Sequence, residues 1–356
     1  MPTRRSLIAA ASTVPFALLS AKGDRKKPLR YLQIGVGHAH AGKISVYRES
    51  SDWEVVGVVE EDAELLAKAK LSPAYKGLKF MTLEEGLNTR DLQVVGVETA
   101  VRDLLRYARL AVEGGFHVHL DKPAGAEISE YREIMKVADA KGLVVQMGYM
   151  YRFNPAVQLL RRMCAAGWLG EVYETHAVMS KVMSPSDRRG AAEFAGGTMF
   201  ELGCHIIDLT LQILGRPDRI VAYPRRVLES DSDQLTDNML AVFEYPKATA
   251  TVRSSALEVD GSSRRHFTVC GTAGTFHIQP LDRPSVRLSL SEERSFSNGD
   301  RYPKGSSEIK FEPPYVRYVG DAADLAAIVR REKENSFPSV HDLNVQAAVL
   351  EASAMK

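Results

Sequence analysis

Lys122 is the first residue of this chain whose position suggests chemistry. It stands in the segment FHVHLDKPAG, directly after an apolar run that ends in Asp121. Pro123 disfavours the α conformation for this lysine, which would help to aim its amine. An ammonium group there can donate to a hydroxyl and lower the cost of losing that hydroxyl's proton. The alternative is a solvated lysine at a strand end, and the residue type alone leaves both open.

A second group of reactive side chains lies in the segment GGTMFELGCHIIDL, over 196–209. Glu201, His205 and Asp208 are spaced i, i+4 and i+7, so on a helix they share one face. An imidazole with a pKa near neutrality suits the removal of a hydroxyl proton while the adjacent C–H bond breaks, and a carboxylate can orient it. The alternative is a histidine of the core or surface, and the spacing alone leaves both open.

The segment YLQIGVGHAHAG, over 31–42, is typical of the start of a dinucleotide-binding βαβ unit. Gly35 lets the chain turn sharply and Gly37 lets the backbone approach a pyrophosphate, while the next helix offers free N–H groups. His40 stands where the fingerprint has its third glycine, and a Gly-x-Gly pair alone is often only a turn. The expected cofactor contacts of this loop are Gly35, Val36, Gly37, His38 and His40.

Glu60 closes the next apolar run, WEVVGVVEED, about 20 residues beyond the glycines. A carboxylate at that strand end can accept hydrogen bonds from the adenosine ribose hydroxyls. Glu61 and Asp62 follow, and no arginine is near enough in the sequence to hold a 2′-phosphate. We therefore expect NAD rather than NADP as the cofactor.

The composition restricts the partners of the chain. Its 356 residues include 46 basic and 45 acidic ones, so a net charge of +1 favours neither nucleic acid nor a membrane surface. The three cysteines form neither a disulfide framework nor a CxxC zinc pattern. The pairs His38 with His40 and His117 with His119 lack a third ligand of recognisable spacing, so we expect no metal.

The N-terminal segment MPTRRSLIAAASTVPFALLSA differs in kind from the rest. Arg4 and Arg5 precede an uncharged stretch that is too short and too rich in small residues to be read as a membrane span. The pattern resembles a twin-arginine leader, so we expect export to the periplasm, with residues 1–28 as signal and linker. The alternatives are a disordered tail or an uncleaved anchor.

From Pro28 onward strands and helices alternate, which predicts an α/β Rossmann domain over 29–150, a doubly wound parallel sheet with helices on both faces. The expected strands are 30–35, 54–60, 93–98, 116–121 and 143–148. The expected helices are 41–50, 62–70, 83–89, 101–113 and 128–141.

After residue 150 the pattern changes, and we expect an α+β domain over 151–356 with a large, mostly antiparallel open sheet. Residues 296–312 are expected to form a loop, and two helices to end the chain. The other expected helices are 155–166 and 199–214. The expected strands are 239–245, 248–255, 264–271 and 274–280.

Together the first-strand glycines, the Asp121-Lys122-Pro123 turn and the histidine helix resemble the Gfo/Idh/MocA oxidoreductases, a family that includes inositol dehydrogenases and glucose-fructose oxidoreductase. The turn corresponds to the family's Glu-Lys-Pro motif with a conservative acid swap. GYMYRFNPA, over 148–156, resembles its Arg-Phe-Asn/Asp-Pro segment, and 196–209 resembles its Gly-Gly…Asp-x-x-x-His helix. The resemblance covers nearly everything after the leader.

The resemblance implies a nicotinamide-dependent enzyme that moves hydride to or from a ring carbon of a sugar, a cyclitol or a sugar derivative. In such an enzyme His205 is the general base, Lys122 polarises the hydroxyl, and Glu201 or Asp208 orients these groups or binds the sugar. Relatives often associate through the open face of the second sheet, which implies a dimer or tetramer.

The resemblance also assigns contacts around the reaction centre. Asp121, Lys122 and Thr99 would lie on the cofactor side. Arg152, Asn154 and Asp208 would contact the substrate, the alternative for Arg152 and Asn154 being a salt bridge and a cap in a domain linker. Two departures stand out: Glu201 replaces the family's aspartate, and 98–103 lacks its usual Thr-Pro-Asn-x-x-His.

Three hypotheses follow. The first is a hydride-transferring oxidoreductase whose cofactor stays bound, because free NAD should be scarce outside the cytoplasm. The second is a redox-neutral glycoside hydrolase or lyase that uses NAD catalytically and returns the hydride at the end. The third is a carbohydrate-binding homologue without catalysis. Production of NADH separates the first two, and sugar binding without NAD binding selects the third.

Overall fold

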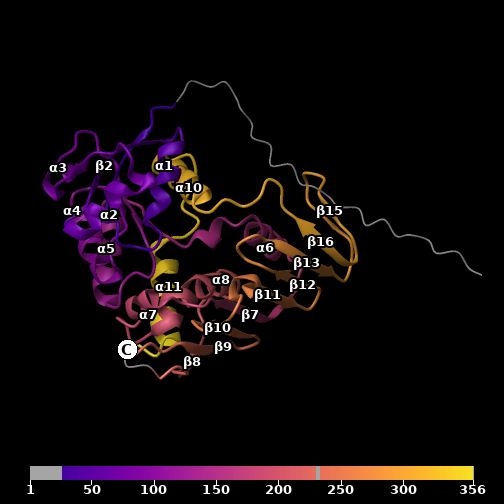
Figure 1. Cartoon of the computed structure of the whole chain (residues 1–356). Coiled ribbons are helices and arrows are strands. Elements are labelled where there is room, and N and C mark those ends of the chain that lie inside the picture. Colours follow the sequence, from indigo (N-terminus) through magenta and orange to yellow (C-terminus); the bar gives the residue numbers. More distant parts are fainter. Residues whose placement is uncertain (1–25, 230–232, 356) are drawn as a thin grey trace, which may run out of the picture.

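The computed structural model describes residues 26–229 and 233–355 of the chain, which form two domains (Figure 1). The leader predicted at the N-terminus lies outside the described residues and stays a prediction. Within the described part, no helix combines the length and apolar content that crossing a membrane requires.

The first domain is built on a parallel sheet with the strand order β3-β2-β1-β4-β5-β6. The strands are β1 (Leu29–Ile34), β2 (Trp53–Val59), β3 (Phe80–Met81), β4 (Val94–Val97), β5 (His117–Leu120) and β6 (Val145–Met147). All five predicted strands are present, and β3 is a two-residue edge strand that the apolar pattern does not reveal. The strand order reverses beside β1, so the carboxyl ends of β1 and β4 face the crevice where open α/β sheets bind ligands.

Helices cover both faces of this sheet, as the alternation predicts. They are α1 (Ile44–Glu49), α2 (Ala63–Leu71), α3 (Leu83–Leu87), α4 (Leu104–Glu113) and α5 (Ile128–Ala140). Asp62 caps α2, and Thr82 with Glu85 forms a reciprocal capping box at the start of α3. The expected stripe on α5 is buried, namely Tyr131, Ile134, Met135 and Ala138.

One helix of the first domain comes from the far end of the chain. Helix α10 (Val319–Val329) lies beside α1 (Figure 1). Its Leu325 packs in one cluster with the aromatic rings of Tyr31, Tyr47 and Trp53. The chain therefore crosses to the second domain, returns to the first for α10, and crosses again.

The second domain is built on an eight-stranded sheet with the order β16-β13-β12-β11-β7-β10-β9-β8. Its neighbouring strands are antiparallel except for β7 and β10, so the predicted mostly antiparallel sheet is confirmed. The strands are β7 (Val172–Ser180), β8 (Arg219–Arg225), β9 (Asn238–Glu244), β10 (Thr249–Ser255), β11 (His266–Gly271), β12 (Gly274–Ile278), β13 (Ser285–Leu290) and β16 (Gly305–Lys310).

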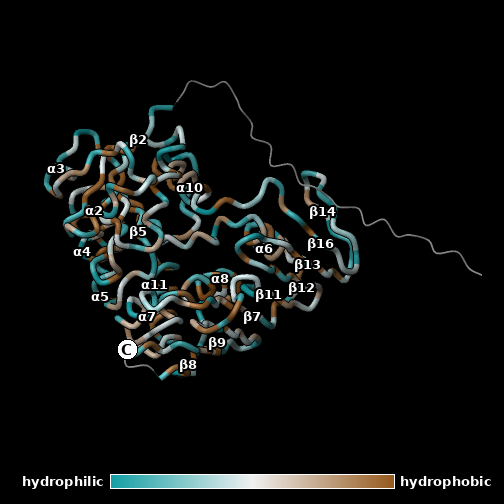
Figure 2. Tube along the Cα trace, in the orientation of Figure 1, coloured by the Kyte–Doolittle hydropathy of each residue, from teal (hydrophilic) through white to brown (hydrophobic). Residues whose placement is uncertain are grey.

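Helices pack on one face of this sheet and leave much of the other open. Helices α8 and α11 contact β7 to β10 from the same side. Along β9 and β10, buried and less buried residues alternate, and hydropathy alternates with them (Figure 2). The helices of this domain are α6 (Pro155–Ala165), α7 (Pro185–Ala191), a π-helical turn (Met199–Gly203), α8 (Cys204–Leu214), α9 (Gly261–Arg264) and α11 (Ser339–Ala352).

The prediction of a loop over 296–312 is wrong. This stretch contains the short strand β15 (Arg301–Tyr302), which pairs with β14 (Arg294–Ser295), and the longer strand β16. Strand β16 lies at the edge of the large sheet and buries only Ile309 of its six residues. A strand that is paired on one side and exposes most of its residues carries little apolar alternation, so the sequence pattern does not indicate it.

Candidate active site

The carboxyl end of β5 brings Asp121 and Lys122 to the sheet edge where the glycine loop (residues 35–40) leaves β1. Asp121 is buried there, and its Oδ1 accepts the Lys122 backbone N–H at 2.7 Å. Asp121 Oδ2 lies 2.8 Å from His38 Nδ1, and Oδ1 lies 3.3 Å from His40 Nδ1. One buried carboxylate therefore ties the glycine loop to the end of β5.

Lys43 is a residue of this cluster that the sequence motifs do not reveal. Its Nζ lies 2.9 Å from Asp121 Oδ2 and 3.0 Å from Glu98 Oε1. Burial opposes ionisation of Asp121, but its contacts with His38 and Lys43 outweigh burial and hold the pKa of the carboxyl well below its usual value. A lone lysine in the first turn after the glycine loop is the signal that could have found Lys43.

Lys122 reaches from the first domain into the second. Its Nζ donates to the backbone carbonyl of Glu201 at 2.6 Å and to the Glu201 carboxylate at 3.1 Å. Burial alone would lower the pKa of Lys122, but the Glu201 carboxylate outweighs it and raises that pKa. Lys122 is therefore a charged donor at neutral pH.

A π-helical turn sets the direction of Glu201. The turn spans Met199–Gly203 and runs directly into α8, which begins one residue before His205. In a π turn the hydrogen bonds span five residues, so Glu201 and His205 do not stack as an i, i+4 pair of an α-helix would. Glu201 pairs with Lys122, and the expected contact in which it orients His205 is not found.

His205 is buried among aromatic rings. Its ring centroid lies 5.4 Å from that of Tyr151 and 6.0 Å from those of Tyr149 and His40. Burial first, and then the positive charge of Lys122, lowers the pKa of His205 well below its usual value. Its Nδ1 is buried without a hydrogen-bond partner among the described residues. The imidazole is therefore neutral and has an unused nitrogen.

The three residues expected to contact substrate point into the protein instead. Arg152 donates from Nη2 to Asp208 at 2.6 Å and to Asp342 at 2.5 Å, and all three side chains are buried. Asn154 caps α6 and donates to the Leu281 carbonyl at 2.8 Å. These contacts satisfy the polar groups internally, so we correct the assignment of Arg152, Asn154 and Asp208 from substrate contact to support of the domain junction.

A cavity of about 350 Å³ lies between the domains. The glycine loop, Ala100 and Val101 line it from the first domain. Residues of α7, together with Phe200 and Glu201, line it from the second. Glu201 thus separates this cavity from the ammonium group of Lys122.

An ion pair joins the two walls of the cavity. Arg102 donates to the Glu193 carboxylate at 2.7 Å, which links the turn Val101–Asp103 of the first domain to the segment after α7. Residues 98–103 lack the family's Thr-Pro-Asn-x-x-His. In this chain, the segment supplies a contact between the domains.

The glycine loop fits the diphosphate of a dinucleotide. Gly35 has a φ of +87°, and a Cβ there would lie 2.5 Å from the Thr99 side chain, so only glycine fits. Among the described residues, the backbone N–H groups of Gly37 and Ala39 donate to no protein acceptor. They are available to phosphate oxygens at the point where the loop enters a helical turn.

Glu60 lies beside this loop, as the βαβ pattern predicts. Its Oε2 accepts the Val36 backbone N–H at 2.8 Å, and its Oε1 accepts the Asp62 N–H at 2.9 Å. The carboxylate is therefore fixed between the first and second strands. This is the position from which an acidic side chain recognises ribose hydroxyls.

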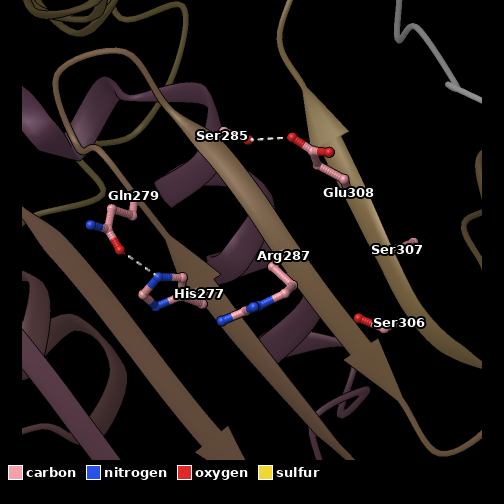
Figure 3. A pocket seen from close by; sticks show the side chains of 7 residues that line it. All are labelled: His277, Gln279, Ser285, Arg287, Ser306, Ser307 and Glu308. Atoms are coloured by element: carbon pink, nitrogen blue, oxygen red, sulfur yellow. Dashed lines mark hydrogen bonds between the residues drawn. The ribbon is translucent and has the colours of Figure 1, made fainter. Parts of the chain in front are cut away.

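A second cavity, of about 490 Å³, lies on the open face of the second sheet, on strands far from the glycine loop (Figures 1 and 3). His277 donates to Gln279 at 3.0 Å, and Ser285 donates to Glu308 at 3.2 Å across this face. The other residues around it are Arg287, Ser306 and Ser307. The residues that line this cavity include the His277 imidazole but no lysine, so they do not combine an ammonium with an imidazole as the interdomain site does.

The fold and this site together define a two-domain, dinucleotide-dependent oxidoreductase. Residues 29–149 match the model described as the oxidoreductase family with an NAD-binding Rossmann fold. Residues 157–277 match the GFO/IDH/MocA C-terminal domain. The chain belongs to the Gfo/Idh/MocA family.

Relatives of the chain include dehydrogenases. It is 27% identical over 248 residues to the uncharacterized oxidoreductase YhhX of Escherichia coli, and this alignment covers 69% of each chain. It is 28% identical over 177 residues to D-xylose 1-dehydrogenase (NADP(+)) 2 of Haloferax volcanii, covering 49% of this chain and 52% of the relative. The structure of GenD2 from gentamicin A biosynthesis, in complex with NAD, shares the fold with a TM-score of 0.75, 17% identity, and coverage of 95% and 97%.

Proposed function

We propose that this oxidoreductase moves hydride between a nicotinamide and a ring carbon of a sugar, a cyclitol or a sugar derivative. The observation that carries the proposal is the meeting of Lys122 with Glu201, one turn before His205, beside the interdomain cavity. A bound nicotinamide supplies the hydride acceptor or donor. The chain supplies the proton transfer and the orientation of the substrate.

His205 has the properties of the base that this reaction needs. Oxidation of a secondary alcohol releases a hydroxyl proton as the C–H bond breaks, and a neutral imidazole can accept that proton. Burial keeps His205 neutral, and its Nδ1 is unpaired within the described structure. The Lys122 ammonium complements it by donating to the same oxygen, which stabilises the negative charge that develops there.

Glu201 controls access to Lys122. In the structure the Glu201 carboxylate accepts a hydrogen bond from the Lys122 ammonium. A substrate hydroxyl therefore reaches Lys122 only after this carboxylate has moved aside. The Glu201 side chain is 25% exposed and that of Lys122 only 1%, so the carboxylate has room to move outward. The carbonyl contact at 2.6 Å holds the ammonium in place meanwhile. We assign Glu201 a positioning role.

NAD is the cofactor that the site favours. The fixed carboxylate of Glu60 would repel the 2′-phosphate of NADP and can accept hydrogen bonds from the ribose of NAD. Similar proteins are associated with either cofactor: the Haloferax volcanii enzyme is named for NADP, and the structure of GenD2 contains NAD. The carbohydrate substrate class is supported by the name of the same Haloferax volcanii relative, a D-xylose dehydrogenase.

We also propose export to the periplasm through the Arg4-Arg5 leader, and a mature form that contacts no membrane. Because free NAD should be scarce there, the cofactor is retained through each turnover. The open face of the second sheet is the surface proposed to join copies of the chain into a dimer or tetramer. Nucleic acid is not among the proposed partners.

The test is to purify the exported form, quantify the nicotinamide bound to it, and screen sugars for hydride exchange. Lys122→Ala and His205→Ala should each lower turnover by roughly 10²–10⁴-fold while the fold and the bound cofactor are kept. Lys136→Ala, a change to an exposed lysine of α5, is the matched control.

Full activity in both site variants would contradict the proposal. Turnover of a glycoside without net NADH would favour the redox-neutral hydrolase or lyase. Sugar binding without NAD binding would select the carbohydrate-binding homologue.

A further inference from the structure

We propose that His38, His40 and Asp121 bind one divalent transition-metal ion of the zinc class. The sequence predicts no metal, because the two histidines of the glycine loop lack a third ligand of recognisable spacing. The fold supplies that ligand from the end of β5. One ligand atom from each residue can be chosen so that all three lie within 4.8 Å of one another. The proposal does not depend on the redox function proposed above.

The hydrogen bonds around His38 leave a lone pair facing a carboxylate. His38 Nε2 lies 3.1 Å from the Lys122 carbonyl, which only accepts, so this nitrogen carries a proton. His38 Nδ1 receives the His40 backbone N–H at 3.2 Å, so it presents a lone pair. The same Nδ1 lies 2.8 Å from Asp121 Oδ2.

Two electron-pair donors at this separation need a cation between or beside them, and besides the Lys43 ammonium that position can be filled by a proton or by a metal ion. A proton or a metal ion on His38 Nδ1 takes the lone pair that the His40 N–H now shares, but only a metal ion can also bind His40 Nδ1 and the Asp121 carboxylate at once. The carbonyl bond to the other ring nitrogen is the support that metal-binding histidines commonly have, because it fixes the tautomer and the ring direction.

The surroundings allow an ion to enter and be held. His40 keeps 16% of its side chain exposed, while Asp121 is fully buried, so the cluster is reached from the His40 side. Lys43 is a positive charge beside the site, 2.9 Å from Asp121 Oδ2. Its charge is shared with Glu98, whose Oε1 lies 3.0 Å from the same Nζ.

The donor set determines the class of ion. Two imidazole nitrogens and one carboxylate oxygen suit Zn²⁺ or Co²⁺, whereas Mg²⁺ and Ca²⁺ prefer oxygen ligands throughout. Three protein ligands leave a fourth, open position on such an ion. The ion would strengthen the connection of the glycine loop to the end of β5, which now rests on the Asp121 contacts and on the contact of His38 with the Lys122 carbonyl.

The test uses the full chain, stripped with chelator and free of added nucleotide, and titrates it with Co²⁺ and with Zn²⁺. We expect one ion per chain, visible absorption bands typical of four-coordinate Co²⁺, and a rise of several degrees in Tm with Zn²⁺. His40→Ala should weaken binding at least tenfold and abolish the Co²⁺ bands. His40→Gln is the second variant if the first does not fold.

His277→Ala is the matched control, because His277 lies among the histidines of the open sheet face. It should leave Co²⁺ binding unchanged. Absence of stoichiometric binding, or equal binding by wild type and both His40 variants, would overturn the metal site. Loss of binding in His277→Ala would do so as well. None of these outcomes depends on sugar turnover, so they leave the proposed function to its own test.

Discussion

Arg152 and Asp208 form a paired charge inside the protein. The guanidinium donates to Asp208 from both Nε and Nη2, at 3.1 and 2.6 Å, and each side chain is 1% exposed. The same guanidinium also holds Asp342 at 2.5 Å. One guanidinium therefore contacts two buried carboxylates, one on α8 and one on α11.

Arg152→Met is expected to destabilise the protein by about 3–5 kcal/mol, because both buried carboxylates lose their guanidinium partner. Asp208 keeps its contacts with Gln212 and His341. The measurement is the midpoint of urea unfolding with the slope m checked for constancy. Arg161→Met is the control, since Arg161 is half-buried on α6 with its guanidinium over the Phe337 ring and makes no hydrogen bond or ion pair with the described residues. Equal losses in the two variants would show that the buried pairing contributes nothing.

Gly35→Ala is expected to weaken NAD binding at least ~10-fold and to lower stability by about 1–3 kcal/mol. The added methyl would meet Thr99 at 2.5 Å, and alanine is strained at a φ of +87°. Gly42→Ala is the matched control, because nothing lies within 4 Å of its Cβ position. Calorimetric titration with NAD checks the first effect and thermal unfolding the second. Unchanged affinity in Gly35→Ala would separate this loop from the cofactor.

Glu60→Ala is expected to weaken NAD binding by about tenfold while leaving NADP binding the same or stronger, which lowers the preference for NAD. Its carboxylate is the acceptor proposed for the ribose hydroxyls and the charge proposed to repel a 2′-phosphate. Glu61→Ala is the control, because Glu61 bonds Tyr107 instead of the glycine loop. Equal losses for both dinucleotides would place the ribose elsewhere.

Asp321→Asn is expected to stabilise the protein at pH 8 and to change little near pH 4. Burial raises the pKa of Asp321 to about 7, against the attraction of Lys43 and with repulsion from Asp121 and Asp324. The folded state therefore binds more protons than the unfolded state between about pH 4 and 7. Stability falls across that window by up to about 1.4 kcal/mol per pH unit and is constant above it.

The measurement is the free energy of unfolding of wild type and variant at several pH values between 4 and 8. Asp103→Asn, at a partly exposed carboxylate, should follow the wild-type profile. A difference between Asp321→Asn and wild type that does not grow with pH would rule out Asp321 as the titrating group.

The parallel sheet could be predicted because each central strand is a short apolar run, and because helices with clear apolar stripes alternate with these runs. The strand ends Glu60 and Asp121 could be located for the same reason. Strand β16 could not, since most of its side chains face solvent and carry no pattern.

The arrangement of the site was harder to predict than its residues. Lys122, Glu201 and His205 were identified from the chain, but the π turn that directs Glu201 to Lys122 depends on one extra residue per turn, which no residue type signals. Arg152 and Asp208 were misassigned because a buried ion pair and a substrate-binding pair use the same residue types. Only packing distinguishes them.

The return of α10 to the first domain has a consequence for biosynthesis. Until residues 319–329 have left the ribosome, the rings of Tyr31, Tyr47 and Trp53 lack the helix that packs against them. The first domain of the nascent chain is thus an incomplete folding unit. The first domain cannot complete its fold until the last tenth of the polypeptide has been synthesised, so the two domains should mature together.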